Sequence, residues 1–316
     1  MPSHRSRFPS RFPADLAEVF NSVREWTQEQ LARWTPQIAV PGHARTGTEE
    51  QAAIAGLHDR EAHLRWEAAA ALGRNSQRSA QAIGGLLETL SDPEPFVRWQ
   101  AAEALARQEV GRVFPVLSEA VRDTDPLRRA AAAEALGKLS GEAACIELRN
   151  ALADPVAAVR VAAAQALGAC GDPTSGPALL PLLDDPDPAV VAAVAAALGS
   201  IGDARTAVSL AQTLDKADRP LLVRRALAAA LARVPHPEAQ PALVNALNDP
   251  DAQVRGYAAQ ALGQVGNEAA WTALEALEKD DSRLLQGTVA DVARRAMTLL
   301  ELRGRQAPPT QPIEGA

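Results

Sequence analysis

The amino-acid sequence predicts an all-α protein, built as a solenoid of stacked helix pairs. The first observation is a phrase that recurs seven times: an Asp, in most copies an Arg six positions later, and a small-residue run ending in Leu. The second is the period, because the closing leucines are 31 or 33 residues apart, as in repeat architectures. The third is composition, since abundant alanine and only 3% aromatics favour closely packed helices over a β-sandwich. The copies begin at Asp59, Asp92, Asp123, Asp154, Asp185, Asp218 and Asp249.

The array is expected to span residues 48–265, with two helices in each unit. In the fourth unit, Asp154 and Pro155 form the turn between them, and Val159, Ala163 and Leu167 mark the buried stripe of the second helix. A glycine follows the closing Leu in most units, where a left-handed residue commonly ends a helix. We therefore expect the second helices to end at these glycines: Gly73, Gly137, Gly168, Gly199 and Gly263.

The ends of the chain have a different composition from the array. Residues 1–13 are expected to form a flexible arm in which Arg-Phe-Pro occurs twice, so Phe8 and Phe12 belong either to a docking peptide or to a disordered end. Residues 14–47 are expected to form an amphipathic capping helix and a linker, since a solenoid needs polar caps. At the other end we expect a C-terminal capping repeat over residues 266–302 and a disordered tail over residues 303–316.

Bulk properties limit the classes of function. The formal net charge of −7 argues against a protein built mainly to hold nucleic acid, so such a partner is unlikely on composition. No stretch approaches the roughly 18 uninterrupted apolar residues of a membrane span. The N-terminus has no apolar core of a secretory signal, and two cysteines do not make a disulfide framework. We expect a cytoplasmic protein with no membrane span.

The repeated pattern D-x-x-x-x-[VL]-R-x-x-A-A-x-A-L-G, with proline in the first helix at Pro115, Pro177 and Pro241, covers about residues 48–300. It resembles HEAT repeats of the short bacterial kind, the class found in phycobilin lyase subunits. This resemblance implies a right-handed α-solenoid superhelix of about seven to eight HEAT-like helix pairs, with the second helices along its concave surface. The family hosts many roles, so the resemblance does not by itself indicate one function.

The repeated Asp and Arg columns invite a catalytic interpretation, but a structural one is favoured. An active site is needed once, whereas these residues recur in every layer. Each Asp is placed to accept hydrogen bonds from free backbone N–H groups at its turn, and each Arg to reach that Asp or its counterpart in a neighbouring unit. Val191 replaces the Arg in the fifth unit and should remove one pair, so that either Asp185 is satisfied by the backbone alone or the array flexes at that layer. The predicted structural ladder includes Asp92, Arg98, Asp123, Arg129, Asp154, Arg160, Asp249 and Arg255.

The residues around each Arg differ between units, and they are the candidates for binding. On the concave face that the resemblance implies, Trp66 and Trp99 occupy equivalent positions in consecutive units, with charged residues nearby. Adjacent Trp, Arg and Glu are typical of a protein-binding hot spot, although both tryptophans would also fit gaps between alanine-rich helices. The same face continues through Glu134 and Lys138. The predicted partner-binding residues are Trp66, Glu67, Arg74, Trp99, Gln100, Glu103, Arg107 and Tyr257.

Motifs for catalysis and for cofactors are not found in the sequence. It contains no glycine-rich phosphate loop, no C-x-x-C pair and no G-x-S-x-G elbow. No His-Glu dipeptide occurs, so the di-iron pattern of hydroxylases built on HEAT repeats is absent. His58 and His63 flank Asp59 and Glu61, but a solvated turn is favoured over a metal site. We predict no catalytic residue, no metal ligand and no cofactor.

These observations favour a non-enzymatic scaffold, or an assembly or maturation factor, that binds a protein partner in the concave groove. The first alternative is a bilin (tetrapyrrole) lyase-like or cofactor-handling protein, which would hold a planar group against the tryptophans. The second alternative is a DNA-binding or DNA-repair HEAT protein. Acidic Glu67, Glu103 and Glu134 in the same groove argue against this one, because they would repel phosphates.

Overall fold

The computed structural model describes residues 46–306, apart from residues 77 and 217. The predicted arm with Phe8 and Phe12, the predicted capping helix and almost all of the predicted tail lie outside the described residues. The chain divides into two units, Met1–Thr46 and Gly47–Ala316, and the description below concerns the second. Its described residues contain 16 α-helices and no β-strand, so the predicted all-α solenoid is confirmed.

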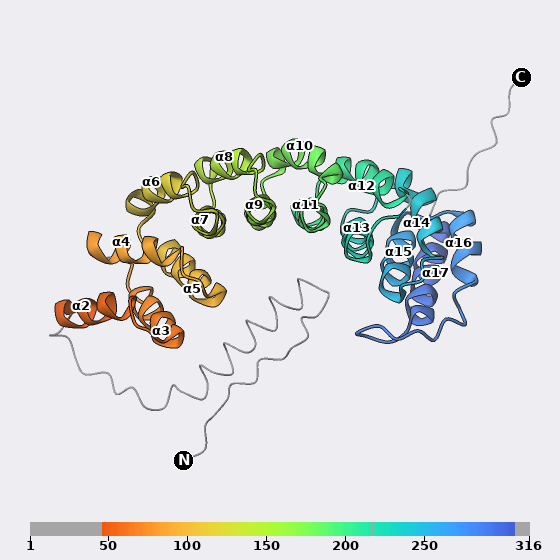
Figure 1. The fold of residues 1–316 in the computed structure, drawn as a ribbon. Helices are drawn as coiled ribbons and strands as arrows, with labels where there is room; N and C mark the ends of the chain where they lie inside the picture. Colours follow the sequence, from red (N-terminus) through yellow and green to blue (C-terminus); the bar gives the residue numbers. More distant parts are fainter. Residues whose placement is uncertain (1–45, 77, 217, 307–316) are drawn as a thin grey trace, which may run out of the picture. The chain divides into compact units, whose positions relative to one another are not determined.

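The helices form eight consecutive pairs, arranged in two rows (Figure 1). The first helix of each pair lies in one row: α2 (Thr46–Gly56), α4 (Ala80–Thr89), α6 (Val110–Ala120), α8 (Glu142–Ala151), α10 (Gly176–Leu179), α12 (Ala207–Leu214), α14 (Gln240–Ala246) and α16 (Glu268–Glu275). The second helices lie in the other row: α3 (Ala62–Leu72), α5 (Pro95–Ala106), α7 (Pro126–Leu139), α9 (Ala157–Cys170), α11 (Pro188–Ile201), α13 (Leu221–Arg233), α15 (Ala252–Val265) and α17 (Val289–Gln306).

Short 3-10 turns adjoin the first helices of the later pairs. They are η2 (Pro173–Ser175), η3 (Leu180–Asp184), η4 (Ala204–Thr206) and η5 (Pro237–Ala239). Pro177 and Pro241 stand at the beginnings of α10 and α14, where a missing backbone N–H costs little. Proline in this column therefore delays the α-helix in two repeats, whereas Pro115 lies inside α6.

One hydrophobic core runs through the array from Ile54 to Met297. Because each second helix packs against the second helix of the next pair, every repeat buries the apolar face of its neighbour. The closing leucines form the centre of this core. Each of them is fully buried: Leu72, Leu105, Leu136, Leu167, Leu198, Leu231 and Leu262.

The glycines after these leucines do not end the helices in the left-handed conformation, so that prediction is wrong. α9 continues past Gly168 to Cys170 and is ended by Gly171, whose φ is 67°. Gly137, Gly199 and Gly263 likewise lie inside α7, α11 and α15. Gly73 does follow α3, but in the right-handed region.

Close approach of neighbouring helices explains the glycines instead. A Cβ atom on Gly137 would lie 2.6 Å from the Cβ of Ala166 in the next second helix. Real Cβ atoms do not approach so closely, so only glycine permits this helix spacing. The same contact recurs along the row, in the pairs Gly73–Ala104, Gly137–Ala166, Gly168–Ala197, Gly199–Ala230 and Gly263–Ala296.

Candidate partner-binding surface

The Arg and Asp columns bind one another across repeat boundaries. Arg160 donates from Nε and Nη2 to the two carboxylate oxygens of Asp185 in the next repeat, at 2.8 and 2.9 Å. Its Nη1 donates to the carbonyl of Asp154 in its own turn at 2.9 Å, and Asp185 also accepts from the N–H of Asp187 at 2.9 Å. Arg160 therefore joins the turn of its own repeat to the turn of the next.

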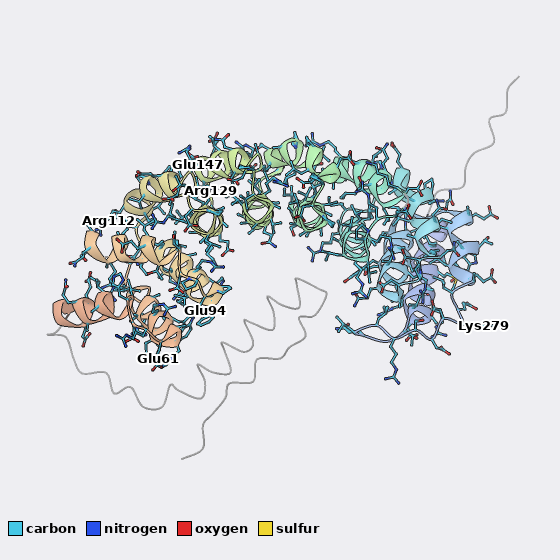
Figure 2. All side chains as sticks on the ribbon, viewed as in Figure 1. Glu61, Glu94, Arg112, Arg129, Glu147 and Lys279 are labelled. Atoms are coloured by element: carbon cyan, nitrogen blue, oxygen red, sulfur yellow. The ribbon has the colours of Figure 1, made fainter. Side chains whose placement is uncertain are left out.

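We refer to the set of such pairs as the Arg–Asp ladder. It comprises Arg65–Asp92, Arg129–Asp154, Arg160–Asp185, Arg224–Asp249 and Arg255–Asp280. Arg129, at the start of α7, is labelled in Figure 2. Burial raises the pKa of Asp185, but hydrogen bonds from Arg160 and from the backbone outweigh it and hold this pKa below its usual value. The charges of the ladder are thus satisfied within the protein.

The ladder is interrupted between the second and third repeats. No hydrogen bond or ion pair joins Arg98 to Asp123 in the described part of the chain, so of the two partners that the sequence left open, Arg98 reaches only its own turn. Arg98 donates only to the carbonyls of Asp92 and Pro93 in its own turn, at 2.7 and 2.9 Å. The Asp123 carboxylate instead accepts from Arg128 at 3.1 Å.

A second interruption follows from Val191, as the sequence indicates. The expectation that Asp185 relies on the backbone alone is wrong, because Arg160 of the preceding repeat binds it. The carboxylate without a ladder partner is Asp218 of the next repeat. Asp218 has a φ of 59°, and the turn before it is two residues longer than in the 31-residue repeats. Asp280, which binds Arg255 at 2.7 Å, is a further member of the ladder that was not predicted. The sequence does indicate this residue, because Asp280 follows Asp249 by 31 residues, which is the period of the repeats.

Trp66 and Trp99 lie on α3 and α5, two second helices that pack together. Both side chains are half-buried, and neither belongs to the hydrophobic core. The Lys138 ammonium from α7 lies 5.5 Å from the Trp99 ring centroid, within the range of a cation–π interaction. Lys138 also binds Glu103 on α5, and Glu103 accepts from Arg107 at 3.2 Å. Trp99 is therefore part of a charged network that crosses from α5 to α7.

Two carboxyl groups in this region have opposite pKa shifts. Burial raises the pKa of Glu103, but Lys138 and Arg107 outweigh it and lower the pKa overall. Burial also raises the pKa of Glu134, and the more distant charges of Lys138 and Arg98 do not compensate. The Glu134 carboxyl accepts no hydrogen bond from any described residue, so it is available to a donor from outside the chain.

The structure places the other predicted binding residues differently. Glu67, Arg74 and Arg107 are exposed. Gln100 is only 7% exposed, so its prediction as a surface contact is wrong. The neighbouring repeat covers this column, and its members in the next three repeats, Ala131, Ala162 and Ala193, are buried as well.

Tyr257 is half-buried against the core on α15, which packs between α13 and α17. The fold does not bring it beside Trp66 and Trp99, which lie at the other end of the row of second helices (Figure 1). Glu134 and Lys138 shared the predicted face by their spacing, but their contacts became visible only in the structure.

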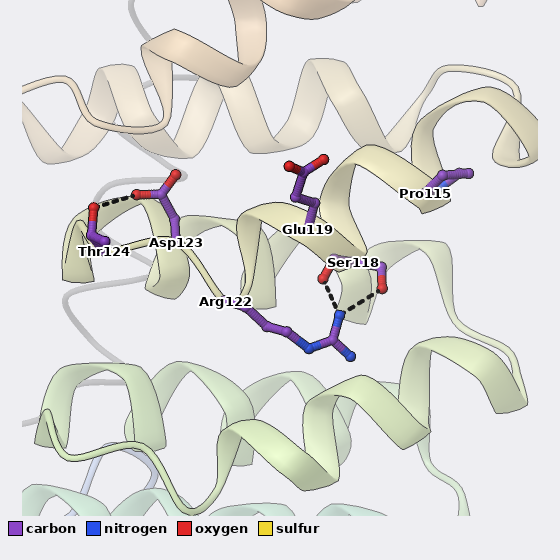
Figure 3. Close-up of a pocket in the computed structure, with 6 residues that line it drawn as sticks. All are labelled: Pro115, Ser118, Glu119, Arg122, Asp123 and Thr124. Atoms are coloured by element: carbon purple, nitrogen blue, oxygen red, sulfur yellow. Dashed lines mark hydrogen bonds between the residues drawn. The ribbon is translucent and has the colours of Figure 1, made fainter.

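A surface depression of about 550 Å³ lies beside α6 and its following turn (Figure 3). Its lining is polar, and two of its charged side chains already have partners: Arg122 binds Ser118 and Glu147, and Asp123 binds Arg128 and Thr124. Among the described residues no three His, Cys, Asp or Glu side chains gather as metal ligands. None of the helices in the described ranges is both long and apolar enough to cross a membrane.

Comparisons with known proteins agree with this geometry. The family model for HEAT repeats matches residues 50–137, 85–159, 147–222 and 210–294. No curated protein matches the sequence. Among solved structures, the chain is similar to YibA of E. coli, with 18% identity, a TM-score of 0.56, and coverage of 84% of this chain and 99% of that one. This likeness concerns the fold alone.

Two further solved structures are similar over most of their length. The complex of CpcE and CpcF of phycocyanin lyase from Nostoc is 27% identical, with a TM-score of 0.37 and coverage of 85% of this chain and 98% of that one. Human deoxyhypusine hydroxylase is 24% identical, with a TM-score of 0.34 and coverage of 81% and 96%. The family model covers well over half of the chain, on the same residues that form the paired helices, and the protein therefore belongs to the HEAT-repeat family.

Proposed function

We propose that this protein is a non-enzymatic binding scaffold whose second helices, α3, α5 and α7, hold a protein partner. The observation that carries the proposal is the pair Trp66 and Trp99, half-buried and outside the core. At the same position the next three repeats have only Ala130, Val161 and Ala192. Large aromatic side chains in this column are thus confined to two adjacent repeats, and tryptophan is enriched among residues that dominate binding energy.

The surroundings of Trp99 favour binding further. Lys138 over its ring and the Glu103 pair limit the conformations of these side chains before any partner arrives. Such preorganisation lowers the entropy cost of association. Exposed Glu67, Arg74 and Arg107 supply the polar rim that interfaces place around an aromatic centre.

The Arg–Asp ladder supports a binding role rather than a catalytic one for this surface. Its acidic and basic groups are bound to each other at the turns, as in Arg160–Asp185. The second helices of the first three repeats therefore offer a partner the tryptophan side chains, the Glu134 carboxyl and a few exposed charged groups. This combination fits recognition of a protein surface.

The proposal is tested with the double variant Trp66→Ala/Trp99→Ala in the full chain. Proteins captured from the native host by the unmodified chain are identified by mass spectrometry, and the Kd of the purified partner is measured by calorimetry. A hot-spot tryptophan contributes at least about 2 kcal/mol, which corresponds to roughly 30-fold in Kd for each residue. We expect the double variant to retain its far-UV helical signal and to lose the partner.

The matched control is Ile146→Ala, which removes an apolar side chain 45% exposed on α8, in the row of first helices. It should leave partner binding unchanged. Equal Kd values for the unmodified chain and the double tryptophan variant would refute the proposal. A partner lost equally from Ile146→Ala would place the interface on the first helices instead.

A further inference from the structure

We propose that the array bends at the contact between α5 and α7, which joins the second repeat to the third. The stiffness of a solenoid depends on the interfaces between neighbouring repeats, because each repeat contacts only its neighbours. Two recurrent contacts join the second helices of this protein: a pair of the Arg–Asp ladder and a close glycine–alanine approach. The α5–α7 boundary has neither.

The ladder contact is present at five of the seven boundaries between described second helices. It is absent at α5–α7, where Arg98 does not reach Asp123, and at α11–α13, where Val191 replaces the arginine. Four of the five ladder pairs are bidentate, whereas Arg255 contacts Asp280 through Nε alone and donates from Nη2 to Ser282. The pairs are largely shielded from water, as shown by Arg160 and Asp185, which are 13% and 8% exposed. Such charge-assisted pairs fix both distance and orientation.

The close glycine–alanine approach is absent at a different set of boundaries. Ala106 at the end of α5 and Ala232 in α13 stand where other repeats have glycine. The α13–α15 boundary keeps the ladder pair Arg224–Asp249, and the α11–α13 boundary keeps the approach of Gly199 to Ala230. Among the described second helices, only α5 and α7 meet without either contact.

Arg128 accounts for the missing ladder pair. The residue before the ladder position is apolar in the other repeats, being Leu64, Val97, Val159, Val190, Val223 or Val254. In the third repeat it is Arg128, which donates to Asp123 at 3.1 Å and to the Ser91 hydroxyl at 3.2 Å. Asp123 is therefore occupied by its own repeat and does not accept from Arg98.

The polar contacts that do cross this boundary are weaker. They are the hydrogen bonds of the Ser91 hydroxyl with Arg128 and Asp125, the Lys138–Glu103 ion pair and the cation–π contact of Lys138 with Trp99. Lys138 and Glu103 are 35% and 22% exposed, and ion pairs open to water contribute little. Figure 1 shows α7, α9 and α11 nearly end-on, whereas the second helices before and after them are seen more from the side.

Bending at this boundary would move Trp99 on α5 relative to Glu134 and Lys138 on α7. If the proposed function holds, the partner contacts both α5 and α7. Its binding would then favour one bend angle at the α5–α7 boundary over others. The bending itself does not depend on any partner, so it is tested without one.

The test uses pairs of spin labels in the full chain, with Cys145 and Cys170 first replaced by alanine. The pair Glu88→Cys/Asn150→Cys places labels on exposed positions of α4 and α8 and spans the α5–α7 boundary. The control pair Gln212→Cys/Thr272→Cys, on α12 and α16, also spans two boundaries, both with ladder pairs. Double electron–electron resonance measures the distribution of distances for each pair.

We expect a broader distribution for the α4–α8 pair than for the α12–α16 pair. Adding Arg128→Val should free Asp123 for Arg98 and narrow the α4–α8 distribution to the width of the control. Equal widths in the unmodified array would overturn the proposal, whether or not the Arg128 variant folds. A broad distribution that Arg128→Val leaves unchanged would refute the assignment of Arg128 as the cause.

Discussion

The backbone of Gly168 in α9 lies so close to α11 that a Cβ atom on this glycine would stand 2.8 Å from the Cα of Ala197. Gly168→Ala should therefore push the two helices apart and destabilise the array, by about 1–3 kcal/mol for an overpacked site. Urea unfolding monitored by circular dichroism measures the change. The control is Gly111→Ala in α6, where a Cβ meets nothing within 4 Å.

The control should shift the unfolding midpoint in the opposite direction, because alanine is the better helix former by roughly 1 kcal/mol. If both substitutions stabilised the protein, the gain in helix propensity at Gly168 would exceed the cost of pushing the two helices apart. The glycine column would then have no packing role.

The second prediction concerns the ladder. Arg160→Ala should lower the free energy of unfolding by about 2 kcal/mol or more, because it leaves the largely buried Asp185 carboxylate with only a backbone donor. Arg205→Ala is the matched control, since Arg205 binds Asp203 but is 84% exposed. We expect no change in its urea midpoint. Similar midpoints for both variants would show that the ladder does not stabilise the array.

Much of the fold could be predicted from the sequence because a repeat shows its buried and turn positions several times. Leu167 and its equivalents are buried as their period indicates. Asp154 pairs with Arg129 of the preceding repeat and Arg160 with Asp185 of the next, as the recurrence of the two columns suggests. The glycine column was misread because two physical causes, a left-handed cap and a close helix contact, both require glycine. Only coordinates distinguish them, as at Gly168.

The candidate surface was harder to predict, since it depends on where single residues depart from the pattern. Gln100 occupies a covered column, which the alanines of later repeats reveal once the helix packing is known. Arg128 breaks an otherwise apolar column, and the effect on Arg98 follows only from its bond to Asp123. The contact between Lys138 and Trp99 joins residues 39 positions apart, which no local pattern specifies.

The third prediction follows from the raised pKa of Glu134. The pKa of this carboxyl group is higher in the folded chain than in the unfolded chain. At pH below the usual 4.5 the group is protonated in both states, so its burial does not lower the free energy of unfolding. As pH rises through the folded pKa, the group ionises in a poorly solvated site, and stability is lost. Glu134→Gln should therefore be more stable than the unmodified chain at pH 8 and equal to it at pH 4.

Thermal unfolding at the two pH values measures this difference. The matched control is Glu67→Gln, on the exposed surface of α3, whose effect on Tm should be the same at both pH values. A Glu134→Gln variant that is less stable at pH 8 would mean that the ionised carboxylate has a stabilising partner. That result would contradict its assignment as an unpaired group.

The last prediction concerns the coupling of Lys138 to Trp99 across the α5–α7 boundary. The ammonium lies 5.5 Å from the ring centroid and is partly open to water, so we expect a coupling energy of roughly 0.5–1 kcal/mol. A double-mutant cycle with Lys138→Met and Trp99→Ala, measured by urea unfolding, gives this energy. Lys138→Met keeps most of the side-chain length while removing the charge. A parallel cycle with Glu103→Gln separates the ion pair from the ring contact, because it leaves the indole in place. Strictly additive effects of the Lys138 and Trp99 substitutions would show that the ring is not held by the cation, and preorganisation of Trp99 would then have no support.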